Sequence, residues 1–261
     1  MRIGQGTVAA GMDEQAGAAL VAALGPGVVI NLAERADRRA EMAGELARLG
    51  LALDVPAVDG PAVRLFAAVR PAEAGGFPTI GTRGCFLSHL GVLRLAREAG
   101  WDRVMILEDD LDFVPDIAGR LPAVLSALEG QDWSLFYGGY GEVPSGARVA
   151  GGLVRLDPAA GVRCTHFMAV RGPAIGELVG YLEAMLARPA GSPEGGPMHV
   201  DGAYSWYRAA HPHRLTLAAV PPLGVQRPSP TDILGRPWFD RVQVLAPVVR
   251  LARSVKRRMR G

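Results

Sequence analysis

The sequence predicts an α/β fold with a mostly parallel central sheet flanked by helices. Three observations lead to this prediction. Short β-branched runs alternate with amphipathic helical segments along the chain. Hydrophobic residues make up 49% of the 261 residues, enough to bury a large core. Polar residues also directly follow several of the apolar runs, as ligand-binding residues do at the carboxyl ends of parallel strands.

The first half of the chain begins with a predicted strand over residues 28–32, a β-branched run that follows Gly27. A helix is predicted over 37–49, because Asp37 can cap it, its apolar residues share one face and Gly50 ends it. The later elements of this half are a strand at 53–58 that closes at Asp59 and Gly60, a loop at 61–80, a helix at 83–99 and a strand at 103–107.

In the second half, helical and strand patterns continue to alternate. The predicted elements are a helix at 121–128, a strand at 133–137, a strand at 162–170, a helix at 174–186, a flexible loop at 189–197 and a strand at 214–220. The organisation predicted from these patterns is a poorly defined extension over 1–26 with a short helix near 13–24, one domain over 27–236, and a basic amphipathic helix over 237–261.

The acidic triplet Glu108-Asp109-Asp110 is the sharpest local feature of the sequence, because an apolar strand leads directly into it. Adjacent carboxylates repel one another unless a cation or solvent lies between them. Carboxylate oxygens are the ligands that Mg²⁺ and Mn²⁺ prefer, and in an extended chain Glu108 and Asp110 point to the same side. We therefore expect a divalent metal on Glu108 and Asp110; the alternative is a solvated acidic turn.

Two other segments carry polar groups toward the same region. Residues 31–39 place several arginines between a strand and a helix start, a position that suits phosphate, although a capped turn with exposed arginines is the alternative. Residues 81–89 place Ser88 and His89 one turn into a helix, where a histidine is more often structural than catalytic. Since the strands that end near Asn31, Asp59, Glu108 and Gly138 are predicted to be parallel, their ends should meet at one crevice.

Composition and charge exclude several classes of function. Net charge is only +2 and the excess lies in the basic C-terminal segment, so general nucleic-acid binding is not expected. Lys256 is the only lysine, which excludes a phosphate-binding loop ending in Gly-Lys and argues against a signalling receiver domain. The scarcity of lysine, together with the abundance of Ala, Gly and Pro, suggests a bacterial source with a GC-rich genome. No Gly-x-Ser-x-Gly elbow is present.

Location is predicted from cysteine usage and hydropathy. Cys85 and Cys164 lie in apolar surroundings without metal-ligand spacing, and we expect free thiols and a cytoplasmic protein. No run has the roughly 20 apolar residues of a spanning helix, and no signal peptide is expected. The helix over 237–261 is expected to contact the anionic inner face of the cytoplasmic membrane peripherally; packing on its own domain is the alternative.

The order of these motifs resembles glycosyltransferase family 25, the lipooligosaccharide glycosyltransferases that also include collagen galactosyltransferases. The matching segments are Ile30-Asn31-Leu32 through Arg35, Asp37 and Arg38, then Ala57-Val58-Asp59-Gly60, Gly84-Cys85-Phe86-Leu87-Ser88-His89 and Leu107-Glu108-Asp109-Asp110. Weaker matches are Ala169-Val170, His199-Val200-Asp201, Pro222-Leu223 to Gln226, and Thr231-Asp232-Ile233. The segment between Gly60 and Gly81 matches nothing in the family pattern, and Pro230-Thr231-Asp232 lacks the serine expected before the Asp.

This resemblance implies a GT-A-like domain, a UDP-sugar donor (often UDP-galactose), Mn²⁺ or Mg²⁺ at the acidic triplet, and inversion at the anomeric carbon. It also implies a glycan or lipid-linked acceptor in lipopolysaccharide or other cell-surface polysaccharide synthesis. The residues that it places around the donor are Asn31, Leu32, Arg35, Asp37, Arg38, Asp59, Gly60, Gly84, Ser88, His89, Asp109 and Gln226.

Inverting transfer also needs a carboxylate on the opposite face of the sugar, to deprotonate the acceptor hydroxyl. Asp201 is the first candidate for this base and Asp232 the second; the alternative for Asp201 is a cap for the helical segment that follows it. Two functional alternatives remain open from the sequence. They are a family member that binds a nucleotide sugar but is inactive, and a metal-dependent phosphohydrolase.

Overall fold

The computed structural model describes residues 5–53, 62–142 and 145–228 of the chain, without the side chains of residues 5–14. Three residues predicted for the site, Asp59, Gly60 and Asp232, lie outside the described residues. The basic helix predicted over 237–261 also lies outside them. No helix in the described ranges is both long enough and apolar enough to cross a bilayer.

One sheet of eleven strands runs through the described part of the molecule. Its strands are β1 (Gly27–Asn31), β2 (Ala52–Leu53), β3 (Ala62–Ala67), β4 (Arg103–Glu108), β5 (Leu111–Phe113), β6 (Leu135–Gly139), β7 (Gly146–Val149), β8 (Leu153–Leu156), β9 (Phe167–Arg171), β10 (Thr216–Ala219) and β11 (Gly224–Gln226). The order is β2-β3-β1-β4-β9-β6-β10-β8-β7, and β11 pairs with both β5 and β6. The pairs among β2, β3, β1 and β4 are parallel, whereas β9 is antiparallel to both of its neighbours, so the sheet is mixed.

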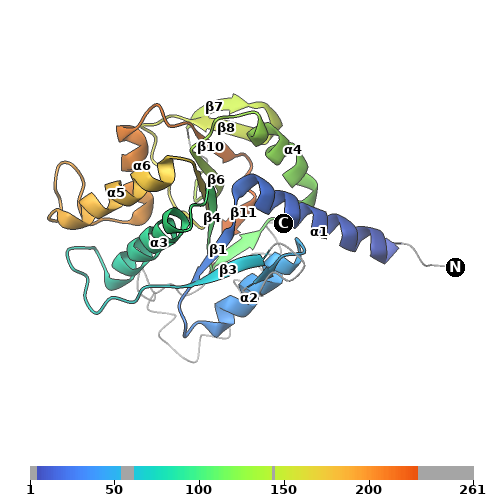
Figure 1. Ribbon diagram of the computed structural model, residues 1–261, viewed down its shortest axis with the longest axis horizontal. Coiled ribbons are helices and arrows are strands. Elements are labelled where there is room, and N and C mark those ends of the chain that lie inside the picture. Colours follow the sequence, from blue (N-terminus) through green and yellow to red (C-terminus); the bar gives the residue numbers. More distant parts are fainter. Residues whose placement is uncertain (1–4, 54–61, 143–144, 229–261) are drawn as a thin grey trace.

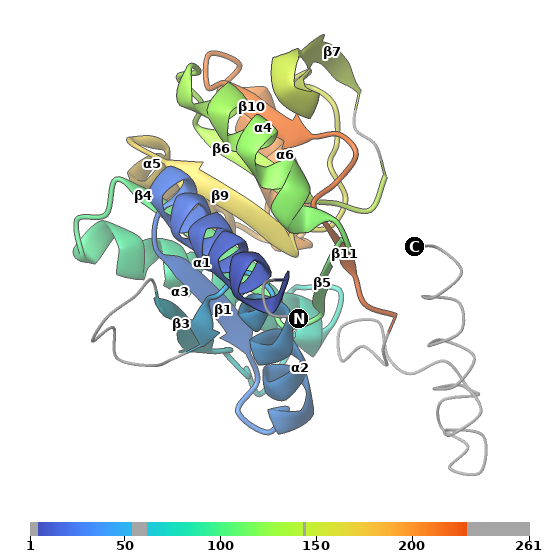
Figure 2. The ribbon, with the colours of Figure 1, turned by 90° about the vertical axis from the view of Figure 1, so that its right-hand side faces the viewer.

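Helices cover both faces of this sheet, which confirms the predicted α/β class (Figure 1). They are α1 (Gln5–Leu24), α2 (Ala36–Ala47), α3 (Ile80–Glu98), α4 (Ile117–Glu129), α5 (Ala174–Ala187) and α6 (Val200–Ala210), with a short 3₁₀ turn at Ala150–Gly152. Helices α3, α5 and α6 pack on one face, and α1, α2 and α4 pack on the other, the face turned to the viewer in Figure 2.

Strand β4 shows how the sequence builds the two cores. Successive side chains of a strand point to opposite faces of the sheet, so a strand covered on both faces must be apolar throughout. Val104 and Ile106 accordingly lie in the core under α3, α5 and α6, and Met105 and Leu107 lie in the core under α1, α2 and α4. All four side chains are fully buried, which makes β4 a rigid support for the acidic triplet that follows it.

The N-terminal segment differs from its prediction. Residues 1–26 were expected to be a poorly defined extension, but Gln5–Leu24 forms the single helix α1. Its side chains Leu20 and Leu24 are fully buried in the core beside α4. The segment is so rich in Ala and Gly that its apolar residues show almost no one-sided pattern, so only the packing of the helix reveals which face is buried.

The prediction of a loop over 61–80 is also wrong at its start, because residues 62–67 form β3. This strand is parallel to β1 and extends the sheet on that side. Its apolar run is interrupted by Arg64, whose guanidinium stacks over the Trp101 ring at 5.0 Å. A short run with a charged residue in its centre resembles a loop, and only its pairing with β1 and β2 makes it a strand.

Four more strands, β5, β7, β8 and β11, were not predicted. Each is three or four residues long. β7 and β8 pair with each other locally across the short 3₁₀ turn, whereas β11 pairs with β5 across more than a hundred residues of sequence (Figure 2). The strand expected at 162–170 begins only at Phe167, since Cys164 has a left-handed backbone with φ of 66°.

Candidate functional site

A cavity of about 260 Å³ opens at the carboxyl ends of β1, β3 and β4, beneath the first turns of α3. The three strands are parallel, so their ends share one edge of the sheet. Half of the residues predicted for the site line this cavity, namely Leu32, Arg38, Gly84, Ser88, His89, Glu108, Asp109 and Asp110. The expected meeting of the strand ends therefore holds for Asn31-Leu32 and the acidic triplet.

Asp109 is the carboxylate that ties the ends of β1 and β4 together. Its Oδ2 accepts a 2.7 Å hydrogen bond from Asn31 Nδ2, and its Oδ1 accepts a 3.0 Å bond from Arg38 Nη1. Burial raises the pKa of Asp109, and the charge of Arg38 and the hydrogen bond from Asn31 partly oppose that rise. Both oxygens therefore have protein donors, which makes Asp109 the structural member of the triplet.

Asp110 has a different environment, although it is equally buried. Its Oδ2 accepts a 3.0 Å hydrogen bond from Gln226 Nε2, but its Oδ1 is buried without any hydrogen-bond partner among the described residues. Burial raises the pKa of Asp110 to about 7, the charge of Glu108 adds to the rise, and the Gln226 bond partly offsets it. A buried carboxylate oxygen without a donor is what a bound cation would satisfy.

Glu108 is held by α3 and by the segment that precedes β9. Its Oε1 accepts a 2.7 Å hydrogen bond from Thr165 Oγ1 and lies 3.2 Å from His89 Nε2. Burial alone would raise the pKa of Glu108, but the hydrogen bonds and charge of His89 and the bond from Thr165 lower it overall. Glu108 is therefore an ionised neighbour of Asp110, and the two carboxylates together favour a divalent cation.

The wall of the cavity opposite the triplet depends on Gly84 and Ser88 of α3. Ser88 Oγ donates to the Gly84 carbonyl at 2.7 Å and accepts from the Val69 backbone N–H at 2.8 Å. A Cβ on Gly84 would lie only 2.7 Å from the Val69 carbonyl oxygen, so this close approach requires glycine. The two residues thus fix the segment after β3, which carries Arg70 into the cavity wall.

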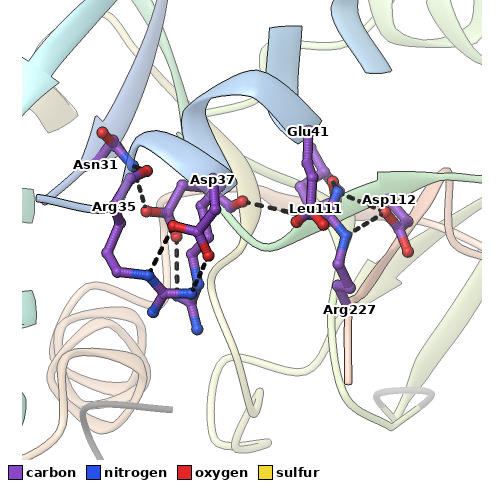
Figure 3. Close-up of polar contacts among 9 residues, drawn as sticks. Asn31, Arg35, Asp37, Glu41, Leu111, Asp112 and Arg227 are labelled. Atoms are coloured by element: carbon purple, nitrogen blue, oxygen red, sulfur yellow. Dashed lines mark hydrogen bonds and ion pairs between the residues drawn. The ribbon is translucent and has the colours of Figure 1, made fainter. Parts of the chain in front are cut away.

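Arg35 and Asp37 lie at the start of α2, the helix that Asp37 was predicted to cap. Arg35, not Asp37, occupies the N-cap position of the helix. The Asp37 carboxylate instead accepts hydrogen bonds of 3.0 and 2.9 Å from the Arg35 guanidinium, which lower its pKa to about 2 (Figure 3). Neither residue lines the cavity, although both stand beside Asn31.

Arg227 is the main polar residue of this region that the sequence did not indicate. It is buried, and it forms ion pairs with Glu41 of α2 at 2.6 Å and with Asp112 of β5 at 2.6 Å (Figure 3). It also donates to the Leu111 carbonyl, and its backbone N–H donates to the Asp110 carbonyl at 2.6 Å. Arg227 therefore fastens β11, with Gln226, against the acidic triplet. It follows a surface-like Pro-rich stretch and gives no sequence signal.

Asp201 lies in the first turn of α6 and does not line the cavity. Its Oδ2 accepts from the Cys164 backbone N–H at 3.0 Å, and its Oδ1 accepts from its own neighbour Gly202 at 2.7 Å. Asp201 is nevertheless near the triplet, because its charge and those of Glu108 and Asp110 all act on Cys164 and raise the pKa of that thiol, after burial, to about 11. It thus stands beside the acidic site rather than within it.

The remaining predicted strand end, Gly138-Gly139, does not reach the cavity. A Cβ on Gly138 would meet the Phe167 ring at 2.5 Å, and one on Gly139 would meet the His166 ring at 2.4 Å. These glycines allow β6 and β9 to pack closely, so their role is structural.

A second cavity of about 620 Å³ between α1 and α4 is lined mainly by apolar side chains and lacks the acidic cluster.

Comparisons with known proteins agree with the resemblance seen in the motifs. No protein-family model matches the chain. The chain is 31% identical over 128 residues to human inactive glycosyltransferase 25 family member 3, covering 44% of this chain and 22% of that protein. It is 33% identical to a glycosyltransferase 25 family member of Anopheles gambiae (42% of this chain, 21% of that protein) and 31% identical to procollagen galactosyltransferase 1 of Danio rerio (42% and 20%).

The aligned part spans about a fifth of the length of these relatives. Among solved structures, a glycosyltransferase involved in glycosylation of the major capsid of PBCV-1 superposes with a TM-score of 0.45 and 11% identity, covering 79% of this chain and 95% of that one. The curated relatives thus carry the family name that the four motifs suggested, and some of them are named inactive.

Proposed function

We propose, from the likeness to glycosyltransferase 25 family members and from the acidic cavity, that this chain transfers a sugar from a UDP-sugar to a glycan or lipid-linked acceptor. UDP-galactose is the donor we favour, since one relative is named a procollagen galactosyltransferase. The transfer inverts the configuration of the anomeric carbon. The acceptor oxygen bonds to that carbon, the bond between the carbon and the diphosphate oxygen breaks, and the proton of the acceptor hydroxyl passes to a protein base.

The environment of the buried Asp110 carboxylate is the single observation that carries this proposal. Within the described part of the chain no group donates to the buried Oδ1 of Asp110. Such a carboxylate beside the ionised Glu108 is unfavourable without a cation, and it lies in a cavity whose wall also holds Arg38 and Arg70. Carboxylate oxygens suit Mn²⁺ or Mg²⁺, so Asp110 and Glu108 would hold such an ion. Bound there, it would neutralise the charge that develops on the leaving diphosphate.

The other residues of the cavity hold the acidic triplet in place or bind the donor. Asn31 and Arg38 hold the Asp109 carboxylate so that the backbone of the triplet keeps its position at the strand end. Arg38 and Arg70 line the cavity and suit the negative charge of a diphosphate. Ser88 and Gly84 keep the wall opposite the triplet close, which limits the room left for water around the donor.

Asp201 is our candidate for the base that accepts the proton of the acceptor hydroxyl. Its carboxylate lies at the start of α6, near Cys164 and outside the donor cavity. Each carboxylate oxygen of Asp201 accepts one backbone N–H bond and keeps a second lone pair for the hydroxyl proton. Asp201→Asn should therefore abolish transfer while donor binding persists, and loss of donor binding instead would make Asp201 a donor ligand.

Calorimetric titration of UDP and UDP-galactose, with and without Mn²⁺, tests the donor site directly. We expect binding that requires Mn²⁺ and that is lost in Asp110→Asn. Asp116→Asn is the matched control, because Asp116 is an exposed carboxylate at the start of α4 outside the cavity. Binding by Asp110→Asn equal to that of the control would refute the metal assignment.

Turnover separates an active enzyme from an inactive binding protein, an alternative favoured by the names of several relatives. Incubation with UDP-[¹³C]galactose and a panel of glycan and glycolipid acceptors, followed by mass spectrometry, should show a labelled hexose on one acceptor class. Donor binding without any transfer or UDP release would identify the inactive form.

Peripheral membrane contact by residues 237–261 remains part of the proposal, and flotation with anionic liposomes, with and without those residues, tests it.

A further inference from the structure

A sulfur, a nitrogen and an oxygen ligand atom converge next to the acidic triplet. Single ligand atoms of Cys85, His89 and Glu108 all lie within 4.8 Å of one another. Cys85 and His89 are four residues apart on α3 and therefore share one face of the helix, and Glu108 ends β4 beneath that face. All three residues line the 260 Å³ cavity.

Neighbouring groups already orient these three side chains. The His89 ring is fully buried, its Nδ1 lies 3.3 Å from the Tyr204 hydroxyl, and the two rings pack edge to face at 5.7 Å. A tyrosine hydroxyl both donates and accepts, so it can accept a hydrogen bond from Nδ1–H in the tautomer that has a free Nε2 lone pair for a metal. Thr165 Oγ1 donates at 2.7 Å to Glu108 Oε1, the oxygen that faces His89, and so holds this carboxylate in place. The hydrogen bond to His89 Nδ1, on the ring atom away from Glu108, is of the kind typical of metal-binding histidines.

The geometry is close to that of a tetrahedral ion. With metal–ligand distances of about 2.0 to 2.3 Å, ligand atoms in such a site lie about 3.5 Å apart. The edge between His89 Nε2 and Glu108 Oε1 is 3.2 Å. The distances from the Cys85 ligand atom are at most 4.8 Å, so they need to shorten by no more than about 1.3 Å to reach this spacing.

We propose that Cys85, His89 and Glu108 form a second metal site, for a borderline-soft divalent ion such as Zn²⁺, whose fourth position opens into the donor cavity. A thiolate and an imidazole select Zn²⁺ or Co²⁺ over Mn²⁺ and Mg²⁺, whereas the all-oxygen surroundings of Asp110 select the reverse. Glu108 belongs to both sets of ligands. Zn²⁺ bound here therefore withdraws Glu108 from the Asp110 site and competes with binding of the hard ion. The site itself does not depend on sugar transfer.

Co²⁺ titration of the full chain tests the site, because cobalt takes zinc's place and a cobalt–thiolate bond absorbs in the near ultraviolet. We expect one equivalent of Co²⁺ to produce this band, Zn²⁺ to abolish it, and Cys85→Ser to lack it. Cys164→Ser is the matched control and should keep the band, since Cys164 is the other cysteine of the chain. Absence of the band from the wild-type protein, or its loss in Cys164→Ser but not in Cys85→Ser, would overturn the proposal.

A measurement on the wild-type protein removes the dependence on how Cys85→Ser folds. X-ray absorption at the zinc edge should show one sulfur and two or three nitrogen or oxygen neighbours, and a shell without sulfur would contradict the site. Asp110→Asn distinguishes this proposal from the proposed function. We expect that variant to keep the cobalt band while it loses Mn²⁺-dependent UDP binding, and loss of the band there would show that the two sites are not separate.

Discussion

Asn31 Nδ2 donates a 2.7 Å hydrogen bond to Asp109 Oδ2, and both side chains are buried. Asn31 is the last residue of β1 and Asp109 is the first residue beyond β4. The bond therefore joins the carboxyl ends of two adjacent parallel strands at the edge of the cavity. It places a neutral amide donor, rather than another charge, against the central carboxylate of the triplet.

A charge at position 31 should make the stability of the protein depend on pH. Asn31→Asp brings two carboxylates into contact, and one must then take a proton to remain buried. The folded-state pKa of this pair is raised above its unfolded value, so the free energy of unfolding falls as pH rises through the folded pKa. The total fall is about 1.4 kcal/mol for each unit by which the pKa is raised. Urea unfolding from about pH 5 to about pH 8 measures this loss. Asn31→Ser is the control, and a pH-independent difference between the two variants would contradict the prediction.

Removal of the charge of Asp110 should stabilise the metal-free protein at alkaline pH. Burial and the charge of Glu108 raise the pKa of Asp110 to about 7 in the folded protein, well above its value in the unfolded chain. The stability that its proton provides is fully present only below the unfolded pKa and is lost as pH rises through about 7. In chelator, Asp110→Asn should gain on the order of 2 kcal/mol over wild type between about pH 5 and about pH 8. A constant difference across this range would refute the buried, raised pKa.

The same carboxyl should link the binding of Mn²⁺ to protons. A metal binds the ionised carboxylate, so binding below a pKa of about 7 must displace a proton. We expect the apparent affinity for Mn²⁺ to fall toward tenfold for each pH unit below that value, and to level off above it. Calorimetry in buffers of different ionisation enthalpy counts the released proton. Equal affinity across this range would exclude Asp110 as a ligand.

Arg227 should be essential for the stability of the acidic edge. Arg227→Met removes a buried guanidinium that pairs with Glu41 and Asp112 and that binds the Leu111 carbonyl. Loss of one member of a buried charge network costs about 3 to 5 kcal/mol. Arg94→Met is the matched control, because its ion pair with Glu183 is exposed and worth at most about 1 kcal/mol.

Chemical unfolding of the two variants measures the difference. Mn²⁺-dependent binding of UDP should also weaken in Arg227→Met, since β11 and Gln226 lose their attachment to the triplet. Equal destabilisation by the two variants would show that the Arg227 network contributes no more than a surface ion pair.

Ser88 should act through the backbone that it holds. Ser88→Ala leaves the Val69 N–H without its acceptor, at a cost of about 1 to 3 kcal/mol. Ser126→Ala in α4 is the control, since Ser126 is exposed and Ala favours helix. Hydrogen exchange of the Val69 amide provides the specific readout, and we expect it to quicken in Ser88→Ala alone. Unchanged exchange at Val69 would show that Ser88 does not fix the cavity wall.

The parts of the fold that were predicted are those whose signal is local. The strands β1, β4 and β6 are buried on both faces, so each is a continuous apolar run, and α3 and α5 show one-sided apolar patterns. The strand β3 and helix α1 lack such a signal. The first carries Arg64 in its centre and the second is nearly uniform in Ala and Gly, so each takes its place only through packing on the rest of the protein.

The candidate site divides in the same way. Glu108, Asp109 and Asp110 could be found from the sequence, because three carboxylates after an apolar strand are a local pattern. Arg227 and Thr165 could not be found, because an isolated arginine or threonine in a loop has no pattern that marks it. Their importance arises from chain segments that are more than fifty residues away from the triplet and reach it only in the folded protein.

The sequence by itself determined that a hydrophobic strand delivers three acidic side chains to one edge of an α/β sheet, since strand formation and the residue that follows it are local properties. Only the tertiary structure decided how the three differ. Asp109 receives donors from Asn31 and Arg38, and Glu108 receives them from Thr165 and His89, whereas one buried oxygen of Asp110 has no donor among the residues that the structure describes. The physical reason is that burial and hydrogen-bond partners from distant segments set the charge and availability of a carboxylate, and neither is encoded next to it in the chain.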